Sequence, residues 1–545
     1  MTPPAQIEAT GAPETAAPAQ LRPKIGFVSL GCPKNLVDSE VMMGLLHHNG
    51  AELTPRAEDA EIIVINTCSF IDSAKQESVN TILEMVQHKQ QNGGKAQRIV
   101  VAGCLVERYR DEIQKNIPEV DAVVGTGELE AILVAAGLTP TGHPNNSPFN
   151  ILTQSQISRA PSAVHQHSHP TEVGTQLQNQ NRSLTLSEGG VEGPAVVSSR
   201  PEGDLREQQG RFSRASWDGA TAALPEYLYS DQTPRILTTP RASAYIKIAE
   251  GCDHPCSFCI IPQLRGKFRS RRMSSIIAEA ENLIKQGVRE ITLIGQDTTC
   301  YGEDLGLTEG LSQLLDALAV LPGLRWLRFL YTYPNKVTTR LLLTMAKHDT
   351  IAKYLDVPLQ HASPSVLRRM KRGGNAQIFL DLIAKARRIV PDIVIRTSFI
   401  VGFPGETEAD YKELEAFITA AKIDWLGVFT YSDEEGAKAF ELADELKVPN
   451  RTIQARRRKL MKLQQKISTK AKSEWVGREI DLLVEGESEE TELLWEGRTA
   501  FHAPEIDGKV LINDFGPHDE LVPGTFYRAE ITESHDYDVV ARILE

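Results

Sequence analysis

Short apolar runs alternate with longer stretches of helical periodicity over the first quarter of the chain. Three runs read as strands, and they are Lys24–Leu30, Glu61–Asn66 and Arg98–Ala102. Each is followed by a segment with apolar residues at helical spacing, as in Ser73–Gln87. Strand and helix in regular alternation predict a parallel sheet with covering helices, an N-terminal parallel α/β domain.

The same alternation returns in the second half of the chain. The predicted strands there are Ala244–Ala249, Glu290–Ile294, Arg325–Tyr331, Tyr354–Val357, Ile393–Val401 and Trp425–Tyr431. Helical periodicity separates them, for example in Ser274–Gln286 and Ala376–Arg388. Repeated βα units predict a partial or complete parallel (β/α) barrel, whose active site forms at the carboxyl ends of its strands.

The pattern changes twice more. Between the two α/β regions the chain is rich in Gln, Asn, Ser, Pro, Gly and His without sustained apolar periodicity, so it cannot bury enough apolar surface to fold. Near the C-terminus, after a basic helical stretch at Asn450–Lys472, short runs separated by turn residues predict a small antiparallel β-barrel. These terminal runs are Glu479–Val484, Lys509–Ile512 and Phe526–Ile531.

We therefore expect an α/β multidomain protein with four segments. These are an N-terminal domain over 23–138, a disordered polar insertion over 139–236, a central barrel over 238–467 and a terminal barrel over 468–545. No apolar run approaches the roughly 18 residues that cross a bilayer, and Met1–Gln20 has no signal-peptide pattern. A cytoplasmic protein without membrane contact is predicted. Its seven cysteines then suggest ligands or reactive thiols rather than disulfides.

Charge is unevenly distributed along the 545 residues. The net charge is −13, and residues 472–545 alone hold 19 Asp and Glu against 6 Lys and Arg. An acidic terminal barrel repels nucleic-acid phosphates and attracts a basic partner. The alternative is a solvated acidic surface that serves solubility only.

The chemistry is concentrated in the run Glu250–Pro262, which contains Cys252, Cys256 and Cys259 at the spacing C-x3-C-x2-C. Three thiolates on one loop can hold three irons of a cubane cluster and leave the fourth iron open for chemistry. Zinc, or a fortuitous trio of thiols, is the alternative, although zinc sites normally have a fourth ligand.

A second trio is spread over the N-terminal domain. Cys32, Cys68 and Cys104 each follow one of the predicted strands. The carboxyl ends of parallel strands share one edge of a sheet, so these cysteines are expected to converge into a second cluster site. Three buried thiols that act as small core residues are the alternative.

Weaker candidates lie near these cysteines. Gln296 ends the second strand of the predicted barrel, where it either faces a cofactor or caps the strand. Asp38 and Glu40 read as charges near the start of a helix. Arg265 belongs to a basic loop that either guides an acidic group or is solvated, and Cys300 matches no cluster position.

The open iron is suited to chelation by the amino and carboxylate groups of S-adenosylmethionine, whose one-electron cleavage yields a 5′-deoxyadenosyl radical. The loop Glu250–Pro262 strongly resembles that of the radical S-adenosylmethionine superfamily. With Cys32, Cys68, Cys104 and the terminal barrel, the chain is similar to the methylthiotransferase family. That resemblance implies two 4Fe-4S clusters, S-adenosylmethionine as cofactor and a terminal TRAM domain that docks the substrate.

Two branches of this family differ in substrate, one modifying tRNA adenosine and the other a ribosomal protein. The run Ser29–Glu40 lacks the Gln-Met-Asn sequence typical of the tRNA branch, and the acidic barrel disfavours RNA as direct substrate. The resemblance thus implies β-methylthiolation of an aspartate in small-subunit ribosomal protein twelve, with an electron donor of flavodoxin or ferredoxin type. A tRNA adenosine methylthiotransferase is the alternative.

Overall fold

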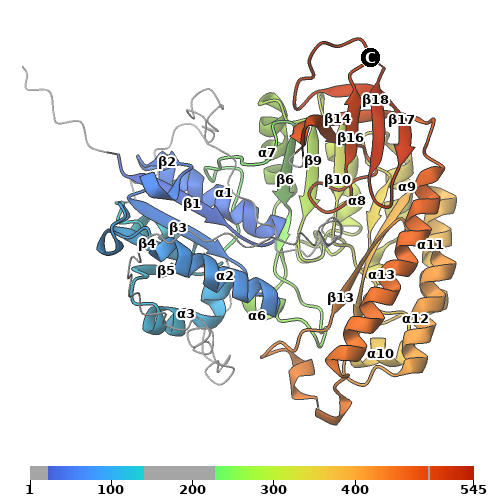
Figure 1. Ribbon diagram of the computed structural model, residues 1–545, viewed down its shortest axis with the longest axis horizontal. Coiled ribbons are helices and arrows are strands. Elements are labelled where there is room, and N and C mark those ends of the chain that lie inside the picture. The colour runs from blue at the N-terminus through green and yellow to red at the C-terminus, as the bar shows by residue number, and fades with distance from the viewer. Residues whose placement is uncertain (1–21, 140–226, 443, 489–490, 545) are drawn as a thin grey trace, which may run out of the picture.

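The computed structural model describes residues 22–139, 227–442, 444–488 and 491–544. In Figure 1 the N-terminal unit, in blue, lies beside the larger central unit, in green to orange, and the terminal barrel, in red, packs on one end of the central unit. Most of the predicted insertion at 139–236 lies outside the described residues. No helix in the described ranges has both the length and the apolar character needed to span a membrane.

The N-terminal unit is a five-stranded, all-parallel sheet in the order β2-β1-β3-β4-β5. Its strands are β1 (Lys24–Ser29), β2 (Glu52–Thr54), β3 (Ile62–Thr67), β4 (Arg98–Gly103) and β5 (Ala122–Val124). Its helices are α1 (Pro33–His48), α2 (Asp72–Val86), α3 (Cys104–Asn116) and α4 (Ile132–Ala135). The three predicted strands are present, and the three-residue strands β2 and β5 were not predicted.

Both faces of this sheet are buried, which explains why its strands are continuous apolar runs. Val64 and Val100 pack on the face covered by α1 and α4, whereas the alternate residues Ile63, Ile65 and Val101 pack on the face covered by α2 and α3. The first of these cores continues into the central unit, so α1 lies between the two units.

The central unit contains two three-stranded parallel sheets, β10-β9-β6 and β11-β12-β13. Its main strands are β6 (Ser243–Lys247), β9 (Glu290–Ile294), β10 (Trp326–Phe329), β11 (Tyr354–Asp356), β12 (Val394–Val401) and β13 (Trp425–Thr430). A bond from Leu327 N to Thr350 O, at 2.8 Å, joins the two sheets between β10 and β11. The result is the expected open (β/α) partial barrel, and all six predicted strands are present.

Most helices of the central unit cover the outside of this partial barrel, and a short two-stranded ribbon lies next to the cysteine loop. The helices are α6 (Ile261–Arg265), α7 (Met273–Lys285), α8 (Gly310–Leu318), α9 (Thr339–Lys347), α10 (Pro364–Arg369), α11 (Ala376–Ile389), α12 (Glu408–Ala421) and α13 (Asn450–Ser473). The antiparallel ribbon consists of β7 (Ala249–Glu250) and β8 (Arg269–Ser270). It brackets the loop that contains Cys252, Cys256 and Cys259 and so fixes both ends of that loop.

The terminal unit is a closed five-stranded barrel in the order β14-β15-β16-β18-β17. Its strands are β14 (Glu479–Ser488), β15 (Thr491–Arg498), β16 (Val510–Asp514), β17 (Phe526–Ser534) and β18 (Val539–Ile543). The pairing differs from the prediction at one place, because β16 and β18 run parallel while the other pairs are antiparallel.

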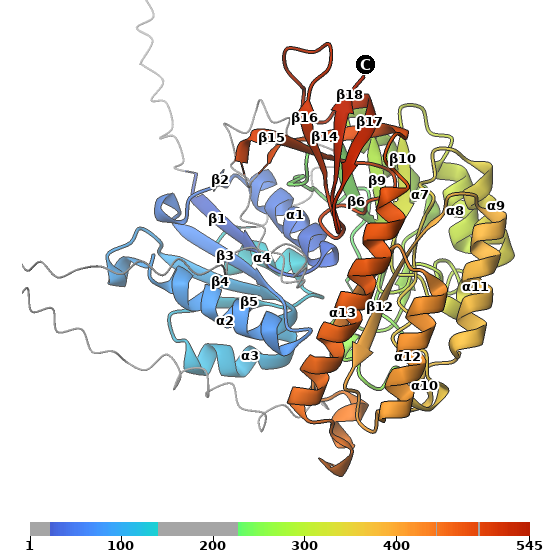
Figure 2. The ribbon, with the colours of Figure 1, turned by 45° about the vertical axis from the view of Figure 1, so that its right-hand side comes forward.

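The terminal barrel is held firmly against the central unit. Helix α13 runs without a break through the predicted boundary at residue 467 and leads directly into the barrel, as Figure 2 shows. Trp425 Nε1 donates to Phe501 O at 2.9 Å, and Arg498 pairs with the buried Glu290 at 2.6 Å. Two independent side-chain contacts in addition to a continuous helix give the barrel a defined position.

The predicted C-terminal boundary of the insertion, residue 236, lies too far along the chain. Residues 227–236 lie within the described part of the chain, and Tyr229 and Arg235 there are only 3% and 5% exposed. Arg235 donates to Glu40 of α1 at 2.6 Å and pairs with Glu279 of α7 at 2.7 Å. This segment therefore packs between the N-terminal and central units, because two buried carboxylates from different units need the cation between them.

Candidate cluster and cofactor sites

Cys32, Cys68 and Cys104 meet at one edge of the N-terminal sheet. They follow β1, β3 and β4, which are three adjacent strands in the sheet. Gly31 has φ +96°, and a Cβ there would lie 2.9 Å from the Cβ of Cys68, so the turn before Cys32 requires glycine. Burial, followed by the neighbouring Cys104 and Cys32, raises the pKa of Cys68 above its usual range. The predicted convergence of this trio is present in the structure.

Cations from both units surround this first trio. Lys34 is half-buried, with Nζ 3.0 Å from the ring centroid of Tyr331, and its desolvation lowers its pKa to about 8 while Cys32 opposes that shift. Arg265, at the end of α6, donates to Cys104 Sγ at 3.4 Å. Positive charge next to thiols favours their thiolate form, which is the form that ligates iron.

Cys252, Cys256 and Cys259 lie on the loop between β7 and α6. Cys259 N donates to Cys256 O at 3.3 Å, which makes the loop tight, and Arg372 donates to Cys256 Sγ at 3.4 Å. Burial raises the pKa of Cys252 to about 11 and that of Cys259 to about 12. The thiols of Cys252 and Cys259 are therefore protonated in the metal-free chain, and metal binding has to displace those protons.

Both trios suit a multi-iron cluster better than a single ion. All seven cysteines are free. In the part of the chain that the structure describes, neither trio brings its three sulfur atoms within 4.8 Å of one another, as ligands of a single ion would be. Thiolates that bind different irons of one cluster need not approach so closely. In each trio, three thiols that each bind a different iron would leave one iron of a four-iron cluster open.

The two trios adjoin each other. Cys104 packs in one small buried cluster with Ile260 and Leu264, and Ile260 directly follows Cys259. Thr126 Oγ1, from the N-terminal unit, donates to Leu264 O at 2.7 Å. The loop of the central unit is thus seated on the cysteine edge of the N-terminal sheet.

Gln296 lies at the end of β9, near the cysteine loop. Its Nε2 donates to Glu250 Oε1 at 2.6 Å, and Glu250 is two residues before Cys252. The Oε1 of Gln296 is buried, and no donor for it occurs among the described residues. An unpaired buried acceptor is costly, so this oxygen is suited to a ligand donor such as an ammonium group.

A polar group that the sequence did not reveal lies beside the loop. His254 Nε2 is 2.5 Å from Asp297 Oδ2, Cys300 Sγ donates to the same oxygen at 3.1 Å, and His254 stacks on Tyr333 with centroids 4.0 Å apart. Burial opposes ionisation of Asp297, but the bonds from His254, Thr299 and Cys300 outweigh it and lower its pKa. Cys300 therefore has a hydrogen-bond partner, Asp297. In the sequence, the one indication of this polar group was the position of His254 between Cys252 and Cys256.

For Asp38 and Glu40 the predicted role is wrong, and for Arg265 one of the two predicted alternatives is excluded. Asp38 and Glu40 are not helix-start charges: Asp38 pairs with Lys247 and Arg265, and Glu40 pairs with Arg235. Arg265 is not a solvated loop residue, because it is only 2% exposed. All three make contacts between the N-terminal and central parts of the chain, which no local pattern encodes.

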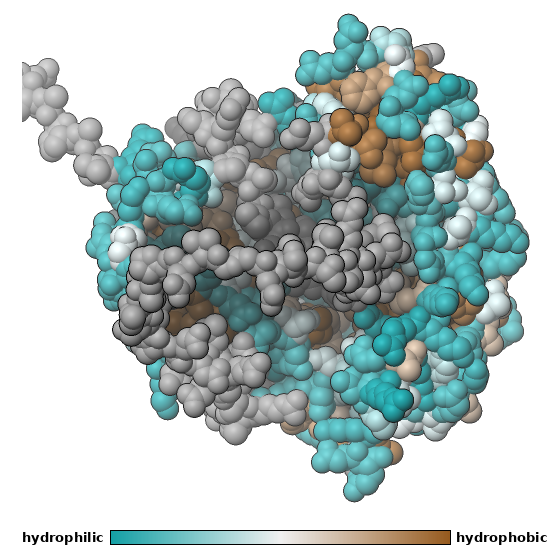
Figure 3. All heavy atoms as spheres, in the orientation of Figure 1, coloured by the Kyte–Doolittle hydropathy of each residue, from teal (hydrophilic) through white to brown (hydrophobic). Residues whose placement is uncertain are grey.

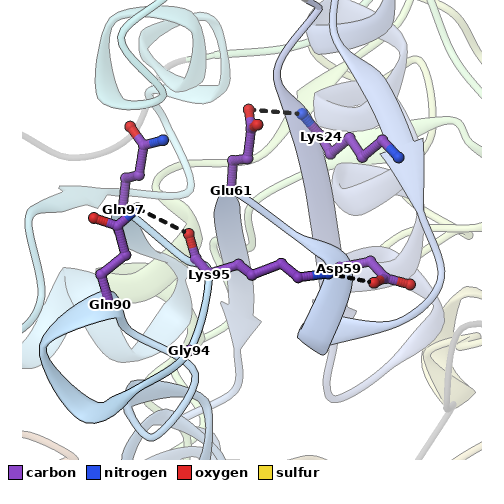
Figure 4. A pocket seen from close by; sticks show the side chains of 7 residues that line it. All are labelled: Lys24, Asp59, Glu61, Gln90, Gly94, Lys95 and Gln97. Atoms are coloured by element: carbon purple, nitrogen blue, oxygen red, sulfur yellow. Dashed lines mark hydrogen bonds and ion pairs between the residues drawn. The ribbon is translucent and has the colours of Figure 1, made fainter.

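A separate polar pocket lies at the opposite edge of the N-terminal sheet. Figure 4 shows its lining, which consists of Lys24, Asp59, Glu61, Gln90, Gly94, Lys95 and Gln97. Lys24 begins β1, whereas Cys32 follows the other end of that strand. The pocket is therefore remote from the cysteines and does not contribute to the cluster sites.

Comparison with known proteins gives three family matches in the same order as the three units. Residues 24–125 match the uncharacterized protein family UPF0004, residues 246–418 the radical SAM superfamily and residues 476–544 the TRAM domain. A solved structure of the radical S-adenosylmethionine methyltransferase TsrM from Kitasatospora setae, with cobalamin and a 4Fe-4S cluster bound, is 14% identical, with a TM-score of 0.46 over 78% of this chain and 75% of that one.

Two curated relatives are named ribosomal protein uS12 methylthiotransferase RimO. The protein from Koribacter versatilis is 64% identical over 96% of this chain and 96% of its own. The protein from Solibacter usitatus is 50% identical over 96% and 95%. The fold and the cysteine loop thus define a radical S-adenosylmethionine enzyme with 4Fe-4S clusters. More narrowly, the chain belongs to the RimO family of methylthiotransferases.

Proposed function

We propose that this chain β-methylthiolates an aspartate residue of small-subunit ribosomal protein uS12. The observation that carries the proposal is the pair of adjoining three-cysteine sites in a chain that is 64% identical to a relative named for that substrate. In this proposal Cys252, Cys256 and Cys259 hold the cluster that binds S-adenosylmethionine. Cys32, Cys68 and Cys104 hold the auxiliary cluster involved in sulfur transfer.

When bound, the clusters and S-adenosylmethionine supply radical chemistry that removes hydrogen from the substrate carbon, together with the sulfur and methyl groups. The protein positions these parts. Gln296 Oε1 would accept a hydrogen bond from the amino group of the cofactor, while its Nε2 remains bonded to Glu250. The buried contact of Cys104 with Ile260 keeps the two sites adjacent.

The acidic terminal barrel supports a basic protein as substrate. A docking surface with an excess of 13 acidic residues over residues 472–545 repels RNA phosphates and attracts basic segments. A flavodoxin- or ferredoxin-type protein is the proposed electron donor. tRNA adenosine is the competing substrate, which the following test distinguishes.

The test is mass spectrometry of uS12 and of tRNA from cells that lack the gene and are complemented with variants. The wild-type chain should restore the methylthio mass increment on one uS12 aspartate, and Cys256→Ala should not. Cys300→Ala is the matched control, because Cys300 belongs to neither trio, and it should retain the wild-type iron content. Methylthiolated tRNA that appears and disappears with the gene, while uS12 stays unchanged, would refute the proposal.

A further inference from the structure

Arg265 is a buried cation that one unit inserts into the cysteine site of another. It ends α6 of the central unit and is 2% exposed. Its guanidinium donates to Cys104 Sγ at 3.4 Å and to Asn35 Oδ1 at 3.2 Å, both in the N-terminal unit. It also pairs with Asp38. The other unit therefore supplies a cation that donates directly to one thiol of the cysteine trio of the N-terminal sheet.

The same guanidinium is connected to the loop of the second trio. Arg265 Nη1 lies 3.4 Å from Glu250 Oε2, and the other oxygen of Glu250 accepts a hydrogen bond from Gln296. Lys247 pairs with Glu250 at 2.5 Å and also with Asp38. Two cations thus face two carboxylates, and every charge in this group is nearly inaccessible to water. Removal of one member leaves an unbalanced charge where screening is weak.

Such a cation acts on a cluster through two known effects. The reduction potential of an iron–sulfur cluster depends on net charge nearby, on hydrogen bonds to its sulfur atoms and on exposure to solvent. Arg265 supplies both a fixed positive charge, since a guanidinium stays protonated, and an N–H directed at a ligand sulfur. Both favour the reduced cluster, which carries one more negative charge.

We propose that Arg265 is a positioning residue that raises the reduction potential of the auxiliary cluster held by Cys32, Cys68 and Cys104, so that this potential depends on docking of the central unit. The inference rests on the proposed assignment of that trio as a cluster site. It adds a residue outside the trio and a role that the cysteines alone do not have.

The second trio supplies a matched internal control. Arg372 donates to Cys256 Sγ at 3.4 Å, the same distance as Arg265 to Cys104, and its guanidinium carbon lies 4.4 Å from the ring centroid of Tyr333. Each trio therefore has one arginine that donates to one of its thiols. Substitution of either arginine should act on its own cluster and leave the other unchanged.

The experiment is an EPR-monitored redox titration of the reconstituted full-length chain. The auxiliary cluster is measured in a background with alanine at Cys252, Cys256 and Cys259, and the other cluster with alanine at Cys32, Cys68 and Cys104. Arg265→Gln should lower the reduced-to-oxidised ratio of the auxiliary cluster at least tenfold at a fixed potential, which for one electron is about 59 mV. Arg265→Lys, which keeps the charge, should give a smaller shift.

The control is Arg372→Gln, which should shift only the cluster of the second trio. An Arg265→Gln titration that is unchanged, or that shifts both clusters equally, would overturn the proposal. If Arg265→Gln does not take up iron, Asp38→Asn provides the test. Removal of that carboxylate should raise the reduction potential of the auxiliary cluster, and a lower or unchanged potential would contradict the proposal. These readings do not depend on uS12 modification, so normal modification with unshifted potentials would refute only the role of Arg265.

Discussion

The unpaired side-chain oxygen of Gln296 is the residue-scale feature that most directly indicates cofactor contact. Its amide nitrogen is fixed by Glu250, so the amide cannot rotate to satisfy Oε1 without breaking that 2.6 Å bond. A ligand that donates to this oxygen gains a hydrogen bond at no cost of reorganisation. We therefore expect the contribution to appear in binding of S-adenosylmethionine.

Gln296→Met tests this expectation, because methionine has a similar length but neither the donor nor the acceptor. A hydrogen bond to a charged group contributes about 1.5–3 kcal/mol, so the Kd of S-adenosylmethionine should rise at least about tenfold. Isothermal titration of the cluster-loaded chain measures it. Gln313→Met, on an exposed position of α8, is the control and should bind like wild type. Unchanged affinity in Gln296→Met would remove this residue from the cofactor site.

At the same scale, the sequence predicts the cysteines of both sites but not the charged residues that contact them. Cys252, Cys256 and Cys259 are recognisable because their spacing is local, and the other trio because each member follows a strand. Arg265 and its partner Asp38 are 227 residues apart, so no periodicity or spacing connects them. Interactions between distant parts of the chain depend on docking, which the pattern of a single segment does not contain.

At the scale of elements, long apolar strands were predictable and short or amphipathic strands were not. Strand β3 is a fully buried run of six residues and β4 is buried in all six but the first, which the hydrophobic pattern shows clearly. Strand β2 has only three residues, and β15 contains three glutamate or arginine residues among its eight, so neither has a continuous apolar signature. Pairing with neighbours, rather than local sequence, makes them strands.

The segment before β6 gives a prediction at this scale. Arg235 connects α1 to α7 through Glu40 and Glu279, and all three side chains are at most 5% exposed. Arg235→Met leaves two buried carboxylates with fewer partners, which should destabilise the docked pair of units by about 3–5 kcal/mol. Urea unfolding followed by tryptophan fluorescence measures the loss.

Gln232→Met is the control for that substitution. Gln232 lies three residues earlier and is exposed, with its side chain bonded only to the adjacent Asp231 among the described residues. It should unfold within about 0.5 kcal/mol of wild type. Equal stability of Arg235→Met and wild type would show that residues 227–236 do not join the two units energetically.

At the scale of the whole molecule, the excess of acidic residues lies in a different unit from the cysteine sites. The cysteine sites lie between the N-terminal and central units, and the excess of acidic residues lies on the terminal barrel. In the view of Figure 3 most of the coloured surface is hydrophilic, and hydrophobic atoms gather at that barrel. Leu493 of β15 is 89% exposed and Val522 is 55% exposed. The barrel thus presents both acidic and apolar side chains to solvent.

Neutralising the acidic residues at the end of β16 and in the loop that follows it should weaken substrate binding. Asp514, Asp519 and Glu520 are exposed, and their replacement by Asn, Asn and Gln removes three negative charges. We expect the Kd for uS12 to rise about three- to tenfold at low salt and the difference to shrink as salt screens it. Fluorescence anisotropy of labelled uS12 at several salt concentrations provides the measurement.

A charge-matched control separates local recognition from net charge. Asp111, Asp349 and Asp392 are exposed on the other two units, and Asn at all three removes the same charge. This variant should bind uS12 like wild type. If both triple variants weaken binding equally, the barrel is not the docking surface, and the long-range field of the whole protein accounts for the attraction.

The unbroken course of α13 has a consequence for substrate selection. Because this helix and the pairs Trp425–Phe501 and Arg498–Glu290 fix the barrel, the distance between the terminal barrel and the cysteine sites is fixed. A folded substrate can react only if its target side chain projects at that span from the segment that docks. Under the proposed function, a target side chain on a shorter or longer segment of the substrate would bind without being modified, so the enzyme would select by length as well as by composition.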